Sequence, residues 1–234
     1  MTDADLGEEP NDILRDWYAE HYSDVTATAN GSVFHVYMHR AMERRHGPKR
    51  TFPHVLEVGG SRGEHIPFVR HQFTDYLLTD LRFPELLESL STDNRIQAQA
   101  CDVSAIPRGD GVFDRVIATC LLHHVDSPLV ALREMRRVVK PGGLITILLP
   151  TDPGLAYRIG KAATSGRAAR RAGIGDRYKL IGAIDHRNHF RSIREQLRYV
   201  FRHDAVEVDW YPFRIASMSL NAFAVFTITT SSAT

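Results

Sequence analysis

The chain has very little cysteine and no long apolar run. Only two of its 234 residues are cysteines, Cys101 and Cys120. Two thiols so far apart in sequence form neither a disulfide framework nor a zinc cluster, so we expect a reducing, cytoplasmic setting. No apolar run approaches the roughly 20 residues that cross a bilayer. The N-terminus is acidic and polar and has no signal-peptide pattern. The sequence therefore predicts no transmembrane segment.

The chain also has almost no net charge. A net charge of +1 argues against strong nonspecific binding of nucleic acid. This mean hides an asymmetry, because residues 1–30 carry eight acids against Arg15 alone, whereas residues 151–202 carry twelve bases against four acids. A hydrophobic content of 43% is ordinary for a globular protein with its own core. The length suits one domain of substantial size.

Hydrophobic periodicity divides the chain at about residue 48. Residues 12–45 have mostly helical spacing, broken at 30–32, so residues 1–48 are predicted to be an acidic tail and an N-terminal helical cap. Residues 49–234 are predicted to be the main domain, with a basic insertion at 151–190. Short apolar runs there alternate with helical segments, which indicates βαβ crossovers and a buried parallel sheet. The expected strands are 54–58, 75–79, 96–100, 113–118, 144–149, 205–210 and 221–229, and the expected helices are 63–71, 84–90, 128–139 and 192–201.

A glycine-containing turn follows the first expected strand. The segment Val55–Gly63 reads V-L-E-V-G-G-S-R-G, and such a turn lets the backbone approach a ligand. Its glycines do not fit the G-x-G-x-x-G dinucleotide fingerprint. Glu57 and Glu64 flank the turn, and their charge disfavours a pyrophosphate and favours a cationic ligand such as S-adenosylmethionine. A plain tight loop is the alternative interpretation.

Two further acids follow the next two strands. Asp80 ends the second strand well beyond the turn, at a position where a carboxylate can accept both hydroxyls of a ribose. Asp102 follows the third strand and is placed for the edge of an adenine. Either acid taken singly is compatible with an ordinary solvated surface residue. Acids at three successive strand ends together indicate a ligand at the topological switch point of the sheet.

These segments resemble the class I S-adenosylmethionine-dependent methyltransferases, in particular the small-molecule branch that includes the ubiquinone/menaquinone C-methyltransferases. The resemblance covers roughly residues 50–150. It is carried by Val55–Gly63, Ile106–Val116, Leu121–Val125 and Val138–Leu144 in this order. It implies an α/β fold with a Rossmann-like, doubly wound, seven-stranded sheet that is mostly parallel and has an antiparallel last strand. It also implies S-adenosyl-L-methionine as the cofactor.

The resemblance assigns cofactor contacts by position. The methionine end is expected at the glycine turn, the ribose at the end of the second strand and the adenine after the third. The residues implied are Glu57, Gly59, Gly60, Ser61 and Gly63 for the methionine end, Asp80 and Leu81 for the ribose, Asp102 and Val103 for the adenine, and Thr119, Cys120 and Leu121 beneath the sulfonium. Two positions depart from the family pattern. Glu57 replaces an aspartate, and Ser61 replaces a glycine, which matters if the backbone there needs a positive φ.

Candidate catalytic residues are histidines and tyrosines. Methyl transfer from a sulfonium depends mainly on positioning, and a base is needed only when the nucleophile must lose a proton. His123 and His124 follow the fourth strand, and one of them is predicted to act as a base or bind the substrate, unless they only pack against the cofactor or bond the backbone. His186 and His189 follow the insertion and are further candidates that could reach the pocket from the opposite side. Tyr22 on the N-terminal helix, with Tyr18, resembles the lid tyrosines of the family, although ordinary helix packing also explains both.

No metal site is predicted. His186 and His189 have H-x-x-H spacing, but no further cysteine or histidine lies near them in the sequence. The basic insertion is predicted to face an anionic small-molecule substrate or to make peripheral contact with a membrane, unless it is a solvated face.

The expected activity is transfer of a methyl group to nitrogen, oxygen or carbon of a small molecule (EC 2.1.1.-), in secondary or specialised metabolism. Alternatives are a lipid-headgroup or quinone methyltransferase that docks through the insertion, and a catalytically silent cofactor-binding relative. The absence of an N-P-P-Y/F tetrapeptide after the fourth strand argues against nucleic-acid bases as acceptors. The sequence leaves the acceptor atom and the oligomeric state open.

Overall fold

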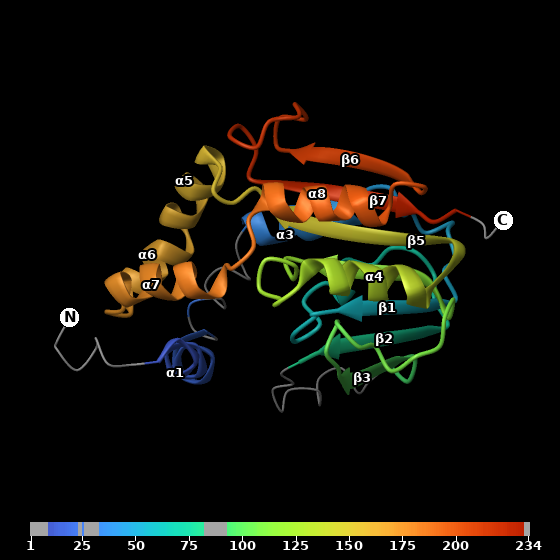
Figure 1. The fold of residues 1–234 in the computed structure, drawn as a ribbon, viewed down its shortest axis with the longest axis horizontal. Helices are drawn as coiled ribbons and strands as arrows, with labels where there is room; N and C mark the ends of the chain where they lie inside the picture. The colour runs from blue at the N-terminus through green and yellow to red at the C-terminus, as the bar shows by residue number, and fades with distance from the viewer. Residues whose placement is uncertain (1–8, 23–24, 26–32, 82–92, 232–234) are drawn as a thin grey trace.

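The protein is built around one seven-stranded sheet. A computed structural model describes residues 9–22, 25, 33–81 and 93–231 (Figure 1). The strands lie in the order β3-β2-β1-β4-β5-β7-β6. Their bounds are β1 His54–Val58, β2 Asp75–Asp80, β3 Ile96–Ala100, β4 Phe113–Thr119, β5 Val139–Pro150, β6 Ala205–Tyr211 and β7 Phe223–Thr229. The first five strands run parallel, and β7 runs antiparallel to both β5 and β6.

The predicted fold class is thereby confirmed, including the reversed last strand. Strand order changes direction between β1 and β4, because β1 leads outward to β2 and β3 while β4 leads to β5. In an open α/β sheet, ligands bind beyond the carboxyl ends of the strands at this switch point.

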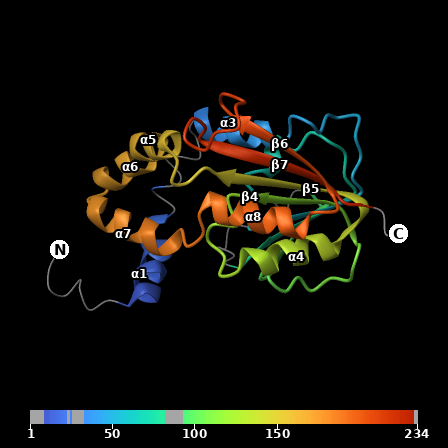
Figure 2. The same ribbon diagram turned by 45° about the horizontal axis from the view of Figure 1, so that its top comes forward.

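Helices cover both faces of the sheet. Helices α4 (Pro128–Val138) and α8 (Phe190–Val200) lie on one face and α3 (Val33–Met42) on the other (Figures 1 and 2). Helix α4 buries Ala131, Leu132, Met135 and Val138, which form one apolar stripe at helical spacing. The sheet's central strands are therefore buried on both faces, and their carboxyl ends are left to form the site.

A separate group of helices lies beyond the carboxyl ends of the strands (Figures 1 and 2). It consists of α1 (Pro10–Asp16), the π-helix η2 (Trp17–His21), α5 (Leu155–Ala163), α6 (Ser165–Arg171) and α7 (Gly175–Asp185), which we call the helical cap. Its core includes Leu14, Trp17 and Ile181, so the N-terminal segment and the insertion share one hydrophobic cluster. Burial of Trp17 against α7 holds together two segments that lie far apart in the sequence.

The prediction of a helix over residues 63–71 is wrong. The chain makes successive turns there and only a short 3-10 helix, η3 (Ile66–Phe68). Pro67 has no N–H for an α-helical hydrogen bond. The segment must also return along the sheet to Gln72, whose N–H donates to the carbonyl of Arg50. An α-helix of nine residues advances only about 13 Å, less than the roughly 17 Å of a five-residue strand.

Other expected elements agree with the structure within a few residues, apart from β5, which begins at Val139 rather than at residue 144, and residues 151–190 contain the helices α5, α6 and α7. The expected helix at 84–90, the chain break at 30–32 and most of the acidic tail lie outside the described residues. No helix in the described part of the chain has the length and apolar character needed to cross a membrane.

Candidate active site

The turn after β1 has a left-handed backbone at three positions. Gly59, Ser61 and Gly63 have φ values of 65°, 46° and 75°. Hydrogen bonds fix the turn, because Gly60 N–H donates to the Thr79 carbonyl at 3.0 Å and Ser61 N–H donates to Asp80 Oδ2 at 2.9 Å. The carboxylate predicted to bind a ribose therefore also holds this turn, which we call the cofactor loop (residues 59–63).

The cofactor loop lies directly against its neighbours. A Cβ atom on Gly59 would come within 2.5 Å of Leu121 Cδ1, and one on Gly60 within 2.2 Å of Leu78 Cδ1. The backbone thus touches the loop that follows β4. Bare backbone at the switch point, beside a carboxylate at the end of β2, fits a nucleoside ligand.

Ser61 is strained as the sequence suggested. An L-residue in this region costs on the order of 1–2 kcal/mol, and a β-branched side chain costs more. We expect Ser61→Gly to leave the free energy of unfolding unchanged or raise it by up to about 1 kcal/mol. The matched variant Ser61→Val should lower it by about 1–2 kcal/mol. Urea unfolding measures both, and equal stability of the two variants would contradict the strain.

Glu57 lies beneath the cofactor loop. Its side chain is almost fully buried, and Tyr76 Oη donates a hydrogen bond of 2.5 Å to Glu57 Oε2. Burial raises the pKa of Glu57. The carboxylate therefore contributes less negative charge than an exposed acid would, and its contact with a cofactor stays a prediction.

The residues expected at the nucleoside end lie beside one another but differ in exposure. Asp80 pairs with Ala100 across β2 and β3, which brings the ends of these strands together. Leu81 is 66% exposed, and Asp102 is exposed and accepts a hydrogen bond from Ser104 N–H. Val103 is buried in the main core. Contacts of Asp80, Leu81, Asp102 and Val103 with an adenosine remain predictions.

The loop after β4 forms the floor between the cofactor loop and the cap. Leu121 packs on Gly59, and Cys120 has a left-handed backbone with φ of 53°. Burial raises the pKa of the Cys120 thiol to about 12. Thr119 Oγ1 lies 3.2 Å from Met42 Sδ on α3. The Cys120 side chain is therefore an uncharged thiol in this floor.

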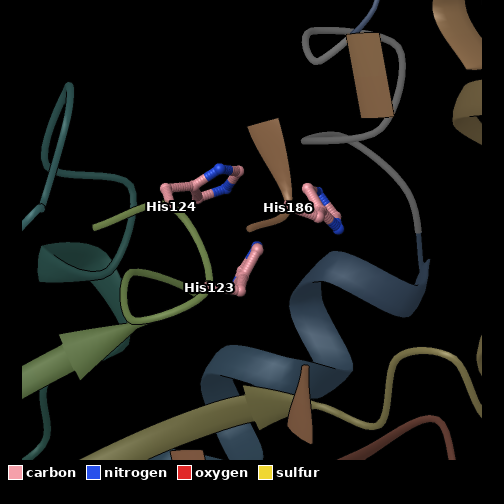
Figure 3. Close-up of side chains that lie close together, drawn as sticks. All are labelled: His123, His124 and His186. Carbon is pink, nitrogen blue, oxygen red and sulfur yellow. The ribbon is translucent and has the colours of Figure 1, made fainter. Parts of the chain in front are cut away.

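Three imidazoles meet beyond this floor. His123 and His124 follow β4, and His186 follows α7 (Figure 3). Their ring centroids lie 3.9 Å apart for His123 and His124, 4.5 Å for His123 and His186, and 5.0 Å for His124 and His186. We call these three residues the histidine cluster.

Two carboxylates support the histidine cluster from outside. His186 Nδ1 lies 3.0 Å from Asp152 Oδ2, in hydrogen-bond geometry. His124 Nδ1 lies 3.0 Å from Asp185 Oδ2, but this approach is too bent for a full hydrogen bond. Burial lowers the pKa of His123 and that of His186, so both imidazoles are neutral at neutral pH.

The lid tyrosines connect the two halves of the site. Tyr18 Oη donates to both oxygens of Asp185 at 3.0 Å. The ring of Tyr22 lies 5.0 Å from that of Tyr18. Burial, followed by the charges of Glu64 and Asp80, raises the pKa of Tyr22 to about 12. Tyr22 therefore lies within reach of Glu64, Asp80 and Asp185, and its role as a lid stays a prediction.

The structure does not bring His189 into the histidine cluster. His189 is exposed and precedes α8 as its N-cap residue. Its catalytic role stays a prediction. In the basic insertion, Lys161 is half-buried and its Nζ lies 5.4 Å from the ring centroid of Tyr178. The exposed bases on α5, α6 and α7 are Arg158, Arg167, Arg170, Arg171 and Lys179, and their docking role also stays a prediction.

Sequence reasoning missed the two supporting carboxylates. Asp152 directly follows β5, just as Asp80 ends β2 and Asp102 follows β3, so the same strand-end argument could have found it. Asp185 ends a cap helix, and no sequence signal places it beside His124.

Comparisons with known proteins agree with this geometry. Residues 56–147 match the family model described as a methyltransferase domain. The chain is 28% identical to the mitochondrial arginine-hydroxylase NDUFAF5 of Danio rerio over 106 residues, which make up 45% of this chain and 33% of the relative. The chain is also 39% identical to the ubiquinone/menaquinone biosynthesis C-methyltransferase UbiE of Coxiella burnetii over 61 residues, which make up 26% of this chain and 24% of the relative. The chain thus aligns with a third or less of each curated relative's length.

A solved structure matches over nearly the whole chain. The 1,6-didemethyltoxoflavin-N1-methyltransferase of Burkholderia thailandensis, with bound 1,6-didemethyltoxoflavin and S-adenosylhomocysteine, superposes with a TM-score of 0.63 at 17% identity. The match covers 96% of this chain and 92% of that one, and it establishes the fold. Residues 56–147 thus match a methyltransferase domain, and the strand order and the loop after β1 agree with this match.

Proposed function

We propose that this protein transfers a methyl group from S-adenosylmethionine to a nucleophilic atom of a small molecule bound under the helical cap. The observation that carries the proposal is the cofactor loop. Its left-handed backbone is tied to Asp80 and lies against Leu121, and it opens at the switch point of the sheet. The matched methyltransferase domain includes this whole segment.

The described residues fit the cofactor in two ways. Asp80 places a carboxylate at the end of β2, at the switch point of the sheet, which suits a ribose diol. The left-handed backbone at Gly59, Ser61 and Gly63 forms a tight turn at the switch point of the sheet, where a ligand is expected. We assign Gly59, Gly60, Ser61 and Gly63 to the methionine end, Asp80 and Leu81 to the ribose, and Asp102 to the adenine. When bound, the cofactor supplies an activated methyl group.

The acceptor is assigned to the space between the floor and the cap. His124 and Cys120 border this region from the loop after β4, and Tyr22 borders it from the N-terminal segment. Asp185 interacts with His124 and with Tyr22. Rates of such displacements depend on alignment of the two reacting atoms, so the walls act mainly by orientation and by exclusion of water. The helical cap does both in this proposal, with Tyr22 on the side of the cofactor loop.

The decisive test is binding of S-adenosylmethionine, measured by calorimetry on the full chain. We expect Asp80→Ala to weaken binding by about 10- to 100-fold, because it removes a charged hydrogen-bond acceptor and releases the loop. Asp75→Ala, at the amino end of the same strand and exposed to solvent, is the matched control and should bind as the wild type does. No detectable binding by the wild type at millimolar cofactor would overturn the proposal.

A further inference from the structure

The histidine cluster has the geometry of a metal site rather than of three independent side chains. One nitrogen from each of His123, His124 and His186 lies within 4.8 Å of the others. In a tetrahedral zinc site, with Zn–N bonds of 2.0–2.1 Å, ligand nitrogens lie about 3.4 Å apart. A closure of up to about 1.4 Å, from 4.8 Å to about 3.4 Å, therefore brings the nitrogens to that spacing, and small rotations of the rings supply it.

His123 gives an independent reason for a ligand. Its side chain is only 5% exposed, and its Nδ1 is buried without a hydrogen-bond partner. A buried polar atom left without a partner costs free energy, and such atoms often mark an absent ion or water. His123 lies between the other two rings and turns a nitrogen toward the space that they enclose (Figure 3). An ion in this space would satisfy it.

The outer contacts follow the pattern of protein metal sites. Histidines that bind metal usually donate their second ring N–H to a carboxylate, which fixes the ring and raises its basicity. Asp152 lies 3.0 Å from His186 Nδ1, and Asp185 lies at the same distance from His124 Nδ1. In both histidines the contact occupies Nδ1 and leaves Nε2 for the ion. Rotation of His124 toward an ion would also straighten its bent contact.

Charge complementarity favours a divalent cation. Asp152 and Asp185 bring two carboxylates next to the three imidazoles. In the part of the chain that the structure describes, the ammonium of Lys161 interacts with both carboxylates. Two carboxylates therefore face one ammonium beside the cluster. It lies beside Tyr22 and so at the acceptor side of the cofactor loop.

We propose that His123, His124 and His186 bind one divalent transition-metal ion, of the zinc type, with an open coordination position for an oxygen atom of the methyl acceptor. Neutral imidazole nitrogens suit such an ion, and three protein ligands leave the fourth position to water or substrate. The acceptor class is then a small molecule with a hydroxyl or carboxylate oxygen. Only the acceptor's identity rests on the proposed function, since the ion can bind without any cofactor.

The test is titration of the full-length, metal-free protein with Co²⁺ and then with Zn²⁺. We expect one equivalent of Co²⁺ to bind with the visible absorption of a four-coordinate site, and Zn²⁺ to displace it. His186→Ala, whose side chain is only half-buried and whose loss need not disturb the core, should weaken Co²⁺ binding at least 100-fold. Asp152→Asn should weaken it about 10- to 100-fold. Removal of the nearby ammonium by Lys161→Met should strengthen it.

His189→Ala is the matched control. This exposed histidine follows His186 closely in the sequence but lies outside the cluster, so its loss should leave Co²⁺ binding unchanged. Loss of binding in His189→Ala would place the ion on the H-x-x-H pair and overturn the proposal. Absence of stoichiometric binding by the wild type, or equal binding by His186→Ala, would overturn it as well. Cofactor binding is measured separately, so failure here leaves the methyl-transfer proposal intact.

Discussion

Replacement of Arg115 by methionine is expected to lower the free energy of unfolding by about 3–5 kcal/mol. The Arg115 side chain is fully buried and donates to both oxygens of Glu43, at 2.7 and 3.1 Å, and to Thr146 Oγ1 at 3.3 Å. Without the guanidinium, the buried carboxylate of Glu43 keeps the His65 imidazole, at 3.1 Å, as a hydrogen-bond partner. Urea unfolding at pH 7 measures the loss.

Two further variants test the cause. In Glu43→Gln/Arg115→Met no charge of the pair remains, so much of the lost stability should return. Arg198→Met removes an exposed i,i+3 partner of Glu195 on α8, and its loss should be under about 1 kcal/mol. If Arg115→Met were no less stable than Arg198→Met, the buried pair would not carry the stability assigned to it.

This ion pair matters for the site because Glu43 also contacts His65, which lies close to the cofactor loop in the sequence. Glu43 directly follows α3, Arg115 lies in β4, and His65 follows the cofactor loop closely in the sequence. His65 Nδ1 in turn contacts His39 Nδ1 at 2.9 Å, and His39 Nε2 contacts His35 Nε2 at 2.8 Å. A neutral imidazole has one donor and one acceptor nitrogen. Each histidine in this row of hydrogen bonds can therefore donate to the next one, and the row ends on the carboxylate of Glu43.

The second large expected effect is loss of stability in mild acid. Burial lowers the pKa of His39 and that of His46 to about 3, and the pKa of His71 to about 4. Each unfolded histidine has a pKa near 6.5, so the unfolded chain takes up protons that the folded chain excludes. The stability from these groups is fully present above pH 6.5 and is lost as pH falls from there toward 3 to 4.

The expected size follows from this linkage. Between pH 7 and pH 5 each buried neutral histidine lowers the free energy of unfolding by roughly 2 kcal/mol. His39, His46 and His71 together therefore remove about 6 kcal/mol, comparable with the whole stability of many domains. Urea midpoints at the two pH values measure it. His71→Gln should reduce the difference by about 2 kcal/mol, because one of the three linked protonations is then lost. Exposed His203→Gln should leave the difference unchanged, and equal stability at both pH values would refute the account.

The sequence by itself determined the alternation of strands and helices in the sheet. Periodicity of two and 3.6 residues, with turn residues between, is local information, and it predicted the parallel strands and the position of Asp80 at the end of β2, while the family resemblance implied the reversed last strand. The strain at Ser61 was also readable, because the family pattern has glycine there and the turn is formed within a few residues. In these places local preference and tertiary structure agree.

Other features were decided only by the tertiary structure. The α-helix expected at 63–71 does not form, because Pro67 lacks an N–H and because the segment must return along the sheet to Gln72. His186 meets His123 and His124 only because packing of Trp17 and Ile181 fixes the cap above the sheet. Spacing along the chain reports neighbours within one element, whereas the histidine cluster joins segments that lie far apart in the sequence. Such a site exists only once burial of the hydrophobic clusters has fixed the distances between these segments.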